Sequence, residues 1–142
     1  MASFIYERRL GVGLTARVGT DLRFALLMSN TTADTETETQ FVGSFSTLDQ
    51  YDGASYARQN VANEAAAVDL TNNRFELTFD PVVFATLGVG TRQAVGLLQL
   101  LHVTNDADSL PDVYYEFSAF DGNGEDVTFT PDAQGAMQAA NA

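Results

Sequence analysis

The sequence predicts a mainly β fold: a single antiparallel β-sandwich or jelly-roll-like domain with little helix. Three observations predict this class. Several short segments have the apolar alternation or the dense apolar run typical of strands, turn-forming residues separate them at short intervals, and helical patterns are few. The chain has 142 residues, of which 45% are apolar. This suits one domain, residues 1–142, built around one hydrophobic core.

Two strands are predicted between residues 22 and 79. The apolar run 22–28 is interrupted only by Arg23, and its length and the turn residues after it favour a buried strand over a helix. In segment 74–79, three apolar residues alternate with three polar ones, which is the period of a strand with one buried face. Pro81 ends this strand, because proline cannot donate a hydrogen bond to a neighbouring strand.

Three further strands are predicted between residues 93 and 130. Segment 93–101 is the most apolar of the chain, so we expect a central strand that is covered on both faces. Segment 113–120 is rich in aromatic residues, and segment 127–130 alternates apolar residues with threonine. Both patterns are typical of strands.

Helix and irregular structure are predicted in the remaining segments. Phe4 to Leu10 fits one short helix within an N-terminal arm or helix that spans residues 1–20. Asn63 to Val68 fits two helical turns or, equally, a strand that begins at Val68. Residues 30–39 are polar and are expected to form an exposed loop. Residues 133–142 are expected to be a flexible tail or a tail that a neighbouring subunit orders.

The charge of the chain excludes one class of partner. Nineteen acidic residues and seven arginines give a net charge of −12, and lysine is absent. Residues 93–142 hold eight acids and no arginine, which leaves His102 as their one potential cation. Such a chain lacks the basic face that phosphate contacts need, so we expect no nucleic-acid partner. The acidic half fits attraction to a basic partner or simply a solvated surface.

No membrane partner is expected either, because no apolar run reaches the roughly 18 residues that a membrane span requires. Residue types for catalysis and cofactor binding are also sparse. One histidine and no cysteine leave no paired histidine ligands and no thiol nucleophile. We interpret His102 as a structural residue at a strand end, and Glu116 as a weak candidate for a glycosidase acid.

Two acidic turns are candidate calcium loops. Segment 121–126 has an oxygen-rich order like that of a calcium loop, but a hairpin turn fits it better because glycine is missing at the sixth position. Segment 105–108 is a second acidic turn with the same two interpretations. We therefore expect no catalytic residue, no cofactor and no metal site.

The arginines are expected to have structural roles. Arg58, Arg74 and Arg92 each lie beside a turn or a strand start, whereas Arg8, Arg9 and Arg17 lie near the N-terminus. Because acids outnumber arginines, most arginines should bind a carboxylate, and arginine can do so through two parallel hydrogen bonds. We expect Arg58 and Arg92 to form structural pairs or a subunit contact.

From Leu22 to Gly135 the chain resembles the head decoration (cement) proteins of tailed bacteriophages. The resemblance consists of short blocks in a fixed order. The blocks are residues 23–28, 30–39, 45–49, 51–58, 72–74, 87–92, 102–111, 124–128 and 132–135.

The resemblance implies a structural virion protein without enzymatic activity. Such a protein is made in the host bacterial cytoplasm, binds the outer capsid surface and stabilises contacts between subunits of the major capsid protein. It also implies a homotrimer, since decoration proteins of this kind commonly lie at three-fold positions between capsomers. The alternatives are a tail or fibre-associated module that binds a host glycan and, less favoured, a small glycan hydrolase.

The residues that we expect at an interface have aromatic or basic side chains. Tyr114, Tyr115 and Phe117 would stack on sugars in the glycan-binding alternative, although a place in the core or at a subunit interface fits them better. The full set is Phe4, Tyr6, Arg8, Arg9, Arg58, Arg92, Tyr114, Tyr115 and Phe117.

Overall fold

A computed structural model describes residues 3–5, 14–69, 74–132 and 137–140. These residues form a mainly β structure in which every strand pair is antiparallel, as the sequence predicts. The strands are β1 Ser3–Ile5, β2 Leu22–Met28, β3 Gln59–Asn60, β4 Ala65–Asp69, β5 Arg74–Thr78, β6 Val82–Leu87, β7 Ala94–Leu101, β8 Leu110–Phe120, β9 Glu125–Phe129 and β10 Met137–Ala140. Two short 3-10 helices are η2 Leu14–Arg17 and η3 Val42–Ser44.

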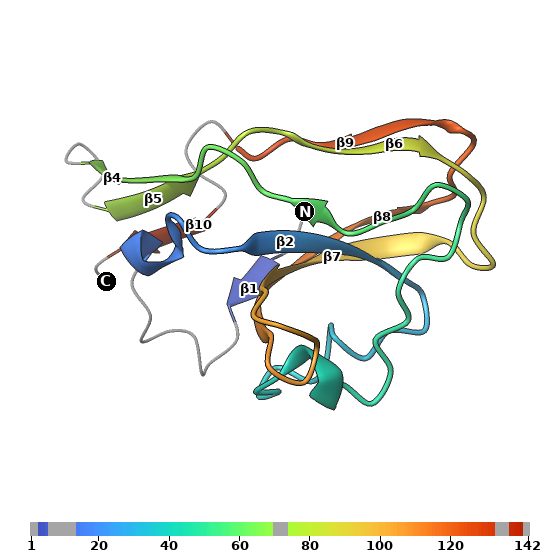
Figure 1. The fold of residues 1–142 in the computed structure, drawn as a ribbon, viewed down its shortest axis with the longest axis horizontal. Helices are drawn as coiled ribbons and strands as arrows, with labels where there is room; N and C mark the ends of the chain where they lie inside the picture. The colour runs from blue at the N-terminus through green and yellow to red at the C-terminus, as the bar shows by residue number, and fades with distance from the viewer. Residues whose placement is uncertain (1–2, 6–13, 70–73, 133–136, 141–142) are drawn as a thin grey trace.

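The strands form two layers (Figure 1). One layer is the five-stranded sheet β1-β8-β7-β2-β3. The other consists of the pair β6-β9 and the three-stranded sheet β10-β5-β4. The main hydrophobic core lies between the layers, because buried residues of β2, β7 and β8 form one cluster with buried residues of β5 and β6.

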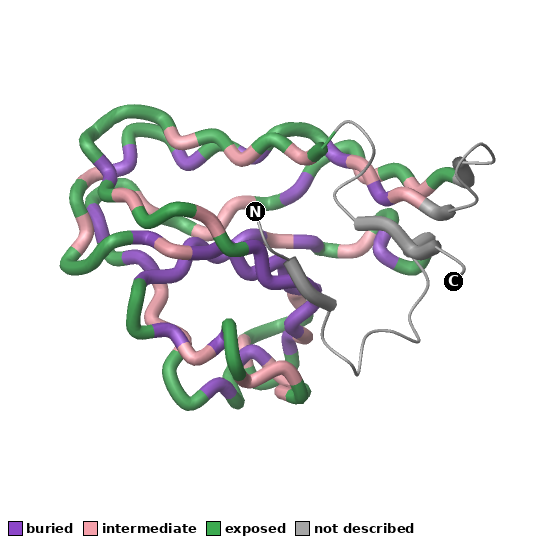
Figure 2. Tube along the Cα trace, turned by 180° about the vertical axis from the view of Figure 1, so that it is seen from behind, coloured by how far each residue is buried: buried purple, intermediate pink, exposed green. Residues whose placement is uncertain are grey.

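The central strands β2 and β7 are buried on both faces, which explains their dense apolar sequences. Phe24 and Leu26 of β2 belong to the core between the layers. Leu27, the next residue along, belongs to a second cluster that includes Val42 and Phe45 from the segment after β2. Figure 2 shows the buried residues concentrated in these central strands. The predicted central strand at 93–101 is thus confirmed.

Several local predictions were wrong. Residues 65–69 form strand β4 and not helical turns, because they pair with β5. Residues 3–5 form a strand that pairs with β8, and the rest of the predicted helix at 4–10 lies outside the described residues. Residues 137–140 pair with β5 of the same chain, so neither a flexible tail nor a neighbouring subunit is needed to account for them. Strand β6 was missed, because its register shifts between Phe84 and Leu87 and this hides the alternation.

Candidate functional site

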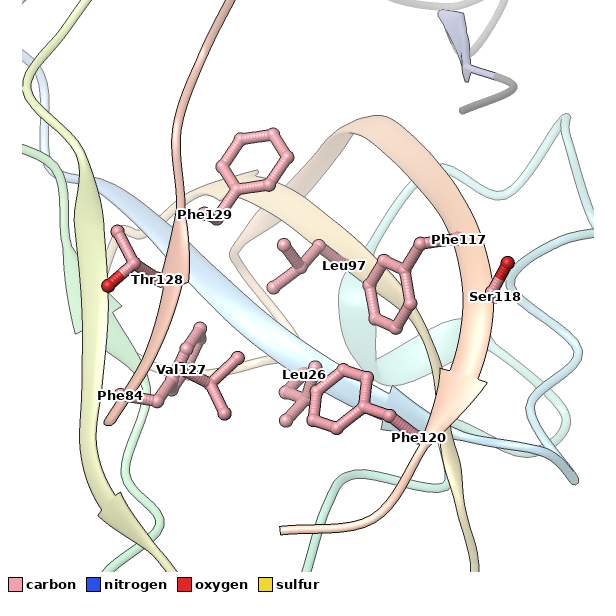
Figure 3. A pocket seen from close by; sticks show the side chains of 9 residues that line it. All are labelled: Leu26, Phe84, Leu97, Phe117, Ser118, Phe120, Val127, Thr128 and Phe129. Carbon is pink, nitrogen blue, oxygen red and sulfur yellow. The ribbon is translucent and has the colours of Figure 1, made fainter. Parts of the chain in front are cut away.

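An apolar pocket of about 320 Å³ lies between the two layers (Figure 3). Phe117 and Phe120 of β8 flank it on one side, and Val127 and Phe129 of β9 flank it on the other. These four side chains are only partly buried, so the pocket is accessible from the surface. The remaining lining residues are Leu26, Phe84, Leu97, Ser118 and Thr128.

An irregularity in β8 places its aromatic residues at this pocket. Gly96 of β7 faces Glu116, whereas Ala94 faces Phe120, so three residues of β8 lie opposite one residue of β7. Such a bulge bends the strand and changes the direction of its side chains. As a result Phe117 and Phe120 both reach the pocket, with their ring centroids 5.4 Å apart. In a strand without a bulge, Phe117 and Phe120 would lie on opposite faces, because side chains alternate between the faces and the two residues are three positions apart.

The strands beside the pocket are strongly acidic. Glu116, Asp121, Glu125 and Asp126 are all exposed, and no lysine, arginine or histidine occurs between residues 103 and 132. Arg17, Arg23, Arg58 and Arg92 form salt bridges with carboxylates elsewhere in the fold. Asp121, Glu125 and Asp126 lie in the segment between the pocket residues Phe120 and Val127, whereas Glu116 acts on the Tyr114 hydroxyl at the other face of β8.

Arg58 forms the structural pair that the sequence predicts. Its guanidinium donates to the Asp106 carboxylate over 2.5 and 2.8 Å and to the side chain of Gln50 over 2.5 Å. The hydrogen bonds from Arg58 lower the pKa of Asp106, and the same bonds raise the pKa of Arg58. Arg58 thereby joins the chain before β3 to the loop between β7 and β8.

Arg92 also forms its predicted pair. Its guanidinium donates two hydrogen bonds to the Asp49 carboxylate, which also accepts a hydrogen bond from the backbone N–H of Asn30 over 2.8 Å. Pairing with Asp49 raises the pKa of Arg92. Both predicted arginines therefore hold loops of their own chain together.

A buried polar network at Arg17 was not singled out from the sequence. Arg17 and Asp112 are 1% and 0% exposed and form two parallel hydrogen bonds, one of them 2.6 Å long. Gln99 donates to the same carboxylate over 2.8 Å and accepts from the Tyr115 hydroxyl over 3.1 Å. The network ties helix η2 to strands β7 and β8. The only sequence signal for it was an excess of acids over arginines.

Tyr51 joins three loops at one end of the molecule. Its hydroxyl donates to the carbonyl of Gly88 and accepts from the backbone N–H groups of Gly90 and Gly122, each over 2.9 Å. A Cβ at Gly122 would lie 2.3 Å from the Gly88 carbonyl oxygen. Only glycine therefore fits at this point without a shift of the backbone.

Two of the aromatic interface candidates are core residues. Tyr114 and Tyr115 are 2% and 3% exposed, so neither ring has a face free for a sugar or a partner. Burial raises the pKa of both hydroxyls, that of Tyr114 to about 12. Phe117 is the one of the three that reaches the surface, at the pocket. The sugar-stacking alternative is thus wrong for Tyr114 and Tyr115, and the favoured interpretation, a place in the core, is confirmed for both.

The N-terminal candidates lie in or beside strand β1. Phe4 lies in β1, where its backbone faces Tyr114 of β8. Tyr6, Arg8 and Arg9 lie outside the described residues.

The remaining polar candidates act within their own loops. His102 follows β7, its backbone N–H donates to the carbonyl of Asp21 over 2.8 Å, and its Nδ1 lies 3.3 Å from the Ser109 hydroxyl. That hydroxyl donates to the carbonyl of Asn105 over 2.7 Å. The arrangement closes the turn between β7 and β8 and agrees with a structural interpretation of His102.

The acidic segment 121–126 is not the predicted hairpin turn. β8 and β9 flank it, but β9 pairs with β6 in the other layer. The segment therefore crosses between layers, and it is anchored there by Gly122 and by Asp126, which accepts from the backbone N–H of Thr86 over 2.8 Å. Within the described part of the chain, no group of three or more acidic or histidine side chains is placed to hold a metal ion. Nor does that part contain a helix long and apolar enough to cross a membrane.

The chain matches no family model, no curated protein and no solved structure. The resemblance to phage decoration proteins thus stays a prediction from the residues.

Proposed function

We propose that this chain is a structural virion protein that binds the outside of a tailed-phage capsid and stabilises contacts between major capsid protein subunits. The observation that carries the proposal is that blocks of the resemblance are joined to one another in space. Tyr51 and Asp52 bind residues 88–91, and Arg58 binds Asp106. Blocks 51–58, 87–92 and 102–111, on which the resemblance rests, therefore belong to one structural unit.

The charge distribution supports an outer position. A net charge of −12 would be repelled by packaged DNA on the inner surface of a capsid, whereas an outer position avoids this repulsion. The acidic residues around the β8–β9 pocket offer a surface to a basic patch of the capsid protein.

The copy number in purified virions tests the proposal. A decoration protein covers the whole shell, so quantitative mass spectrometry should find hundreds of copies per virion. Capsids assembled without this chain should also lose their major capsid protein contacts at a lower temperature than decorated ones, and adding the purified chain back should restore the difference. A count of a few dozen copies would contradict the proposal.

A tail or fibre module that binds a host glycan is the second candidate. The observation that favours it is the partly exposed pair Phe117 and Phe120, since sugars stack on aromatic rings. Binding on a glycan array that is abolished by Phe117→Ala, together with a low copy number, would support this candidate instead.

A further inference from the structure

We propose that the slot between residues 117–120 of β8 and residues 125–129 of β9 binds an extended basic segment of the partner protein. One apolar side chain of this segment fills the pocket. The identification of that partner as the major capsid protein rests on the proposed function. The chemistry of the occupant follows from the pocket, from the strand edges beside it and from the surrounding charge.

The pocket requires an apolar occupant. Its volume of about 320 Å³ is at the lower end of the roughly 300 to 1,000 Å³ of ligand sites, which suits a side chain more than a large cofactor. Seven of the nine lining residues are aliphatic or aromatic, and water needs several polar partners to be held in such a space. An aromatic or leucine side chain would gain the apolar contacts that water cannot make.

The two strands beside the pocket have edges that can accept an extended chain. β8 pairs with β1 only over residues 113–115, so among the described strands nothing pairs with the outer edge of residues 117–120. β9 pairs with β6 on one side, and its other edge has no partner strand in the described part of the chain. Unpaired edges bind extended peptides through backbone hydrogen bonds, while a pocket selects a side chain.

The charge around the slot favours a basic partner over other occupants. Asp121, Glu125 and Asp126 are exposed in the segment that joins the pocket residues Phe120 and Val127, and Arg17, Arg23, Arg58 and Arg92 pair with other carboxylates. A second copy of this chain would bring the same excess of carboxylates and be repelled, as would a nucleic acid. Lysine or arginine beside the apolar anchor would instead be attracted.

A labelled synthetic peptide tests this chemistry directly. The probe alternates lysine and threonine around a central phenylalanine. One control peptide has serine at the centre, and another has glutamate in place of lysine. Fluorescence anisotropy should show binding of the probe that is at least about tenfold weaker with central serine, because the buried ring is lost. The glutamate peptide should not bind. Backbone amide NMR shifts should fall on residues 117–120 and 125–129.

Variants of the protein test the site. Phe117→Ala removes one wall of the pocket and should weaken binding of the probe at least about tenfold. The double variant Asp121→Asn/Glu125→Gln keeps the pocket intact and should weaken binding severalfold while reducing its dependence on salt. Matched controls are Val103→Ala, which shortens an exposed apolar side chain elsewhere, and Glu38→Gln, which removes an exposed charge from the 30–39 loop. Both controls should bind as the original protein does.

Several outcomes would overturn the inference. These are equal binding of the phenylalanine and serine peptides, NMR shifts outside the slot, and equal loss with the control variants. A trimer in solution that Phe117→Ala converts to monomers would show that a second copy occupies the slot.

Binding to capsids that lack this chain tests the slot proposal and the proposed function separately. If the original protein does not bind them, the proposed function fails. If Phe117→Ala and Asp121→Asn/Glu125→Gln bind them as well as the original does, the function stands and the slot proposal is wrong.

Discussion

At the scale of single residues, Arg17 and Asp112 show how far apart in sequence the partners of a buried charge can be. They are 95 residues apart and both side chains are buried. A buried pair of this kind stabilises little compared with apolar residues of the same size, but removal of one partner leaves the other charge without compensation in the core.

We therefore expect Asp112→Ala to lower the free energy of unfolding by about 3–5 kcal/mol. The double variant Arg17→Met/Asp112→Leu should lose much less free energy of unfolding, because it leaves no unpaired charge. Urea unfolding followed by tyrosine fluorescence measures both. Asp21→Asn is the matched control, since it breaks the exposed pair with Arg23 and should cost at most about 1 kcal/mol. Equal losses in the single and double variants would contradict the expectation.

The pair Arg58 and Asp106 predicts a dependence on pH. Because Arg58 lowers the pKa of Asp106 in the folded protein, the pair stabilises the fold fully above the unfolded pKa of aspartate, about 4. This contribution is lost as the pH falls through the lower, folded pKa. Arg58 is 18% exposed and Asp106 is 39% exposed, so we expect Arg58→Ala to cost only about 1 kcal/mol at neutral pH.

Urea unfolding of both proteins from about pH 7 down to about pH 3 measures the difference. The gap in stability between the original protein and Arg58→Ala should be largest at neutral pH and shrink below about pH 4. A gap that stays constant over this range would show that the charge of Asp106 does not matter.

At the scale of elements, β10 shows that residues 137–140 of the C-terminal segment are part of the fold. It pairs with β5 along its whole length, from Met137 opposite Leu77 to Ala140 opposite Arg74. A chain that ends after Asp132 would lose this strand and leave β5 with one neighbour, β4. We expect this truncation to lower the melting temperature by about 4 °C or more.

The matched control ends after Ala140 and retains β10. It should melt at the same temperature as the full chain, and hydrogen exchange should show that β5 amides lose protection only in the shorter variant. If both truncations behave alike, the tail contributes nothing to the fold, as expected of a flexible segment.

At the scale of the whole molecule, we expect a homotrimer. The resemblance to decoration proteins implies it, and the edge strands β3 and β4, which are not part of the slot, favour an assembly that covers them, because the chain has no lysine with which to protect an edge. Light scattering on the purified protein should give the mass of three chains. A stable monomer at high concentration would exclude a trimer that forms before capsid binding.

The sequence by itself determined the fold class and the main strands, because burial on one or both faces leaves a local pattern. The run 22–28 and the run 93–101 are apolar at almost every position, and each proved to be a strand with both faces covered. The excess of acids also predicted that Arg58 and Arg92 bind carboxylates, although it did not identify which ones.

Only the tertiary structure decided which segments meet. The alanines 65–67 have no side chains that distinguish a helix from a strand, so pairing with β5 fixed their conformation. The slot depends on a bulge in β8 and on β9 pairing with β6 instead of β8. Arg17 finds Asp112 only because η2 lies against the sheet. Local periodicity records whether a residue is buried, whereas contacts between distant segments depend on backbone geometry that no short stretch of sequence encodes.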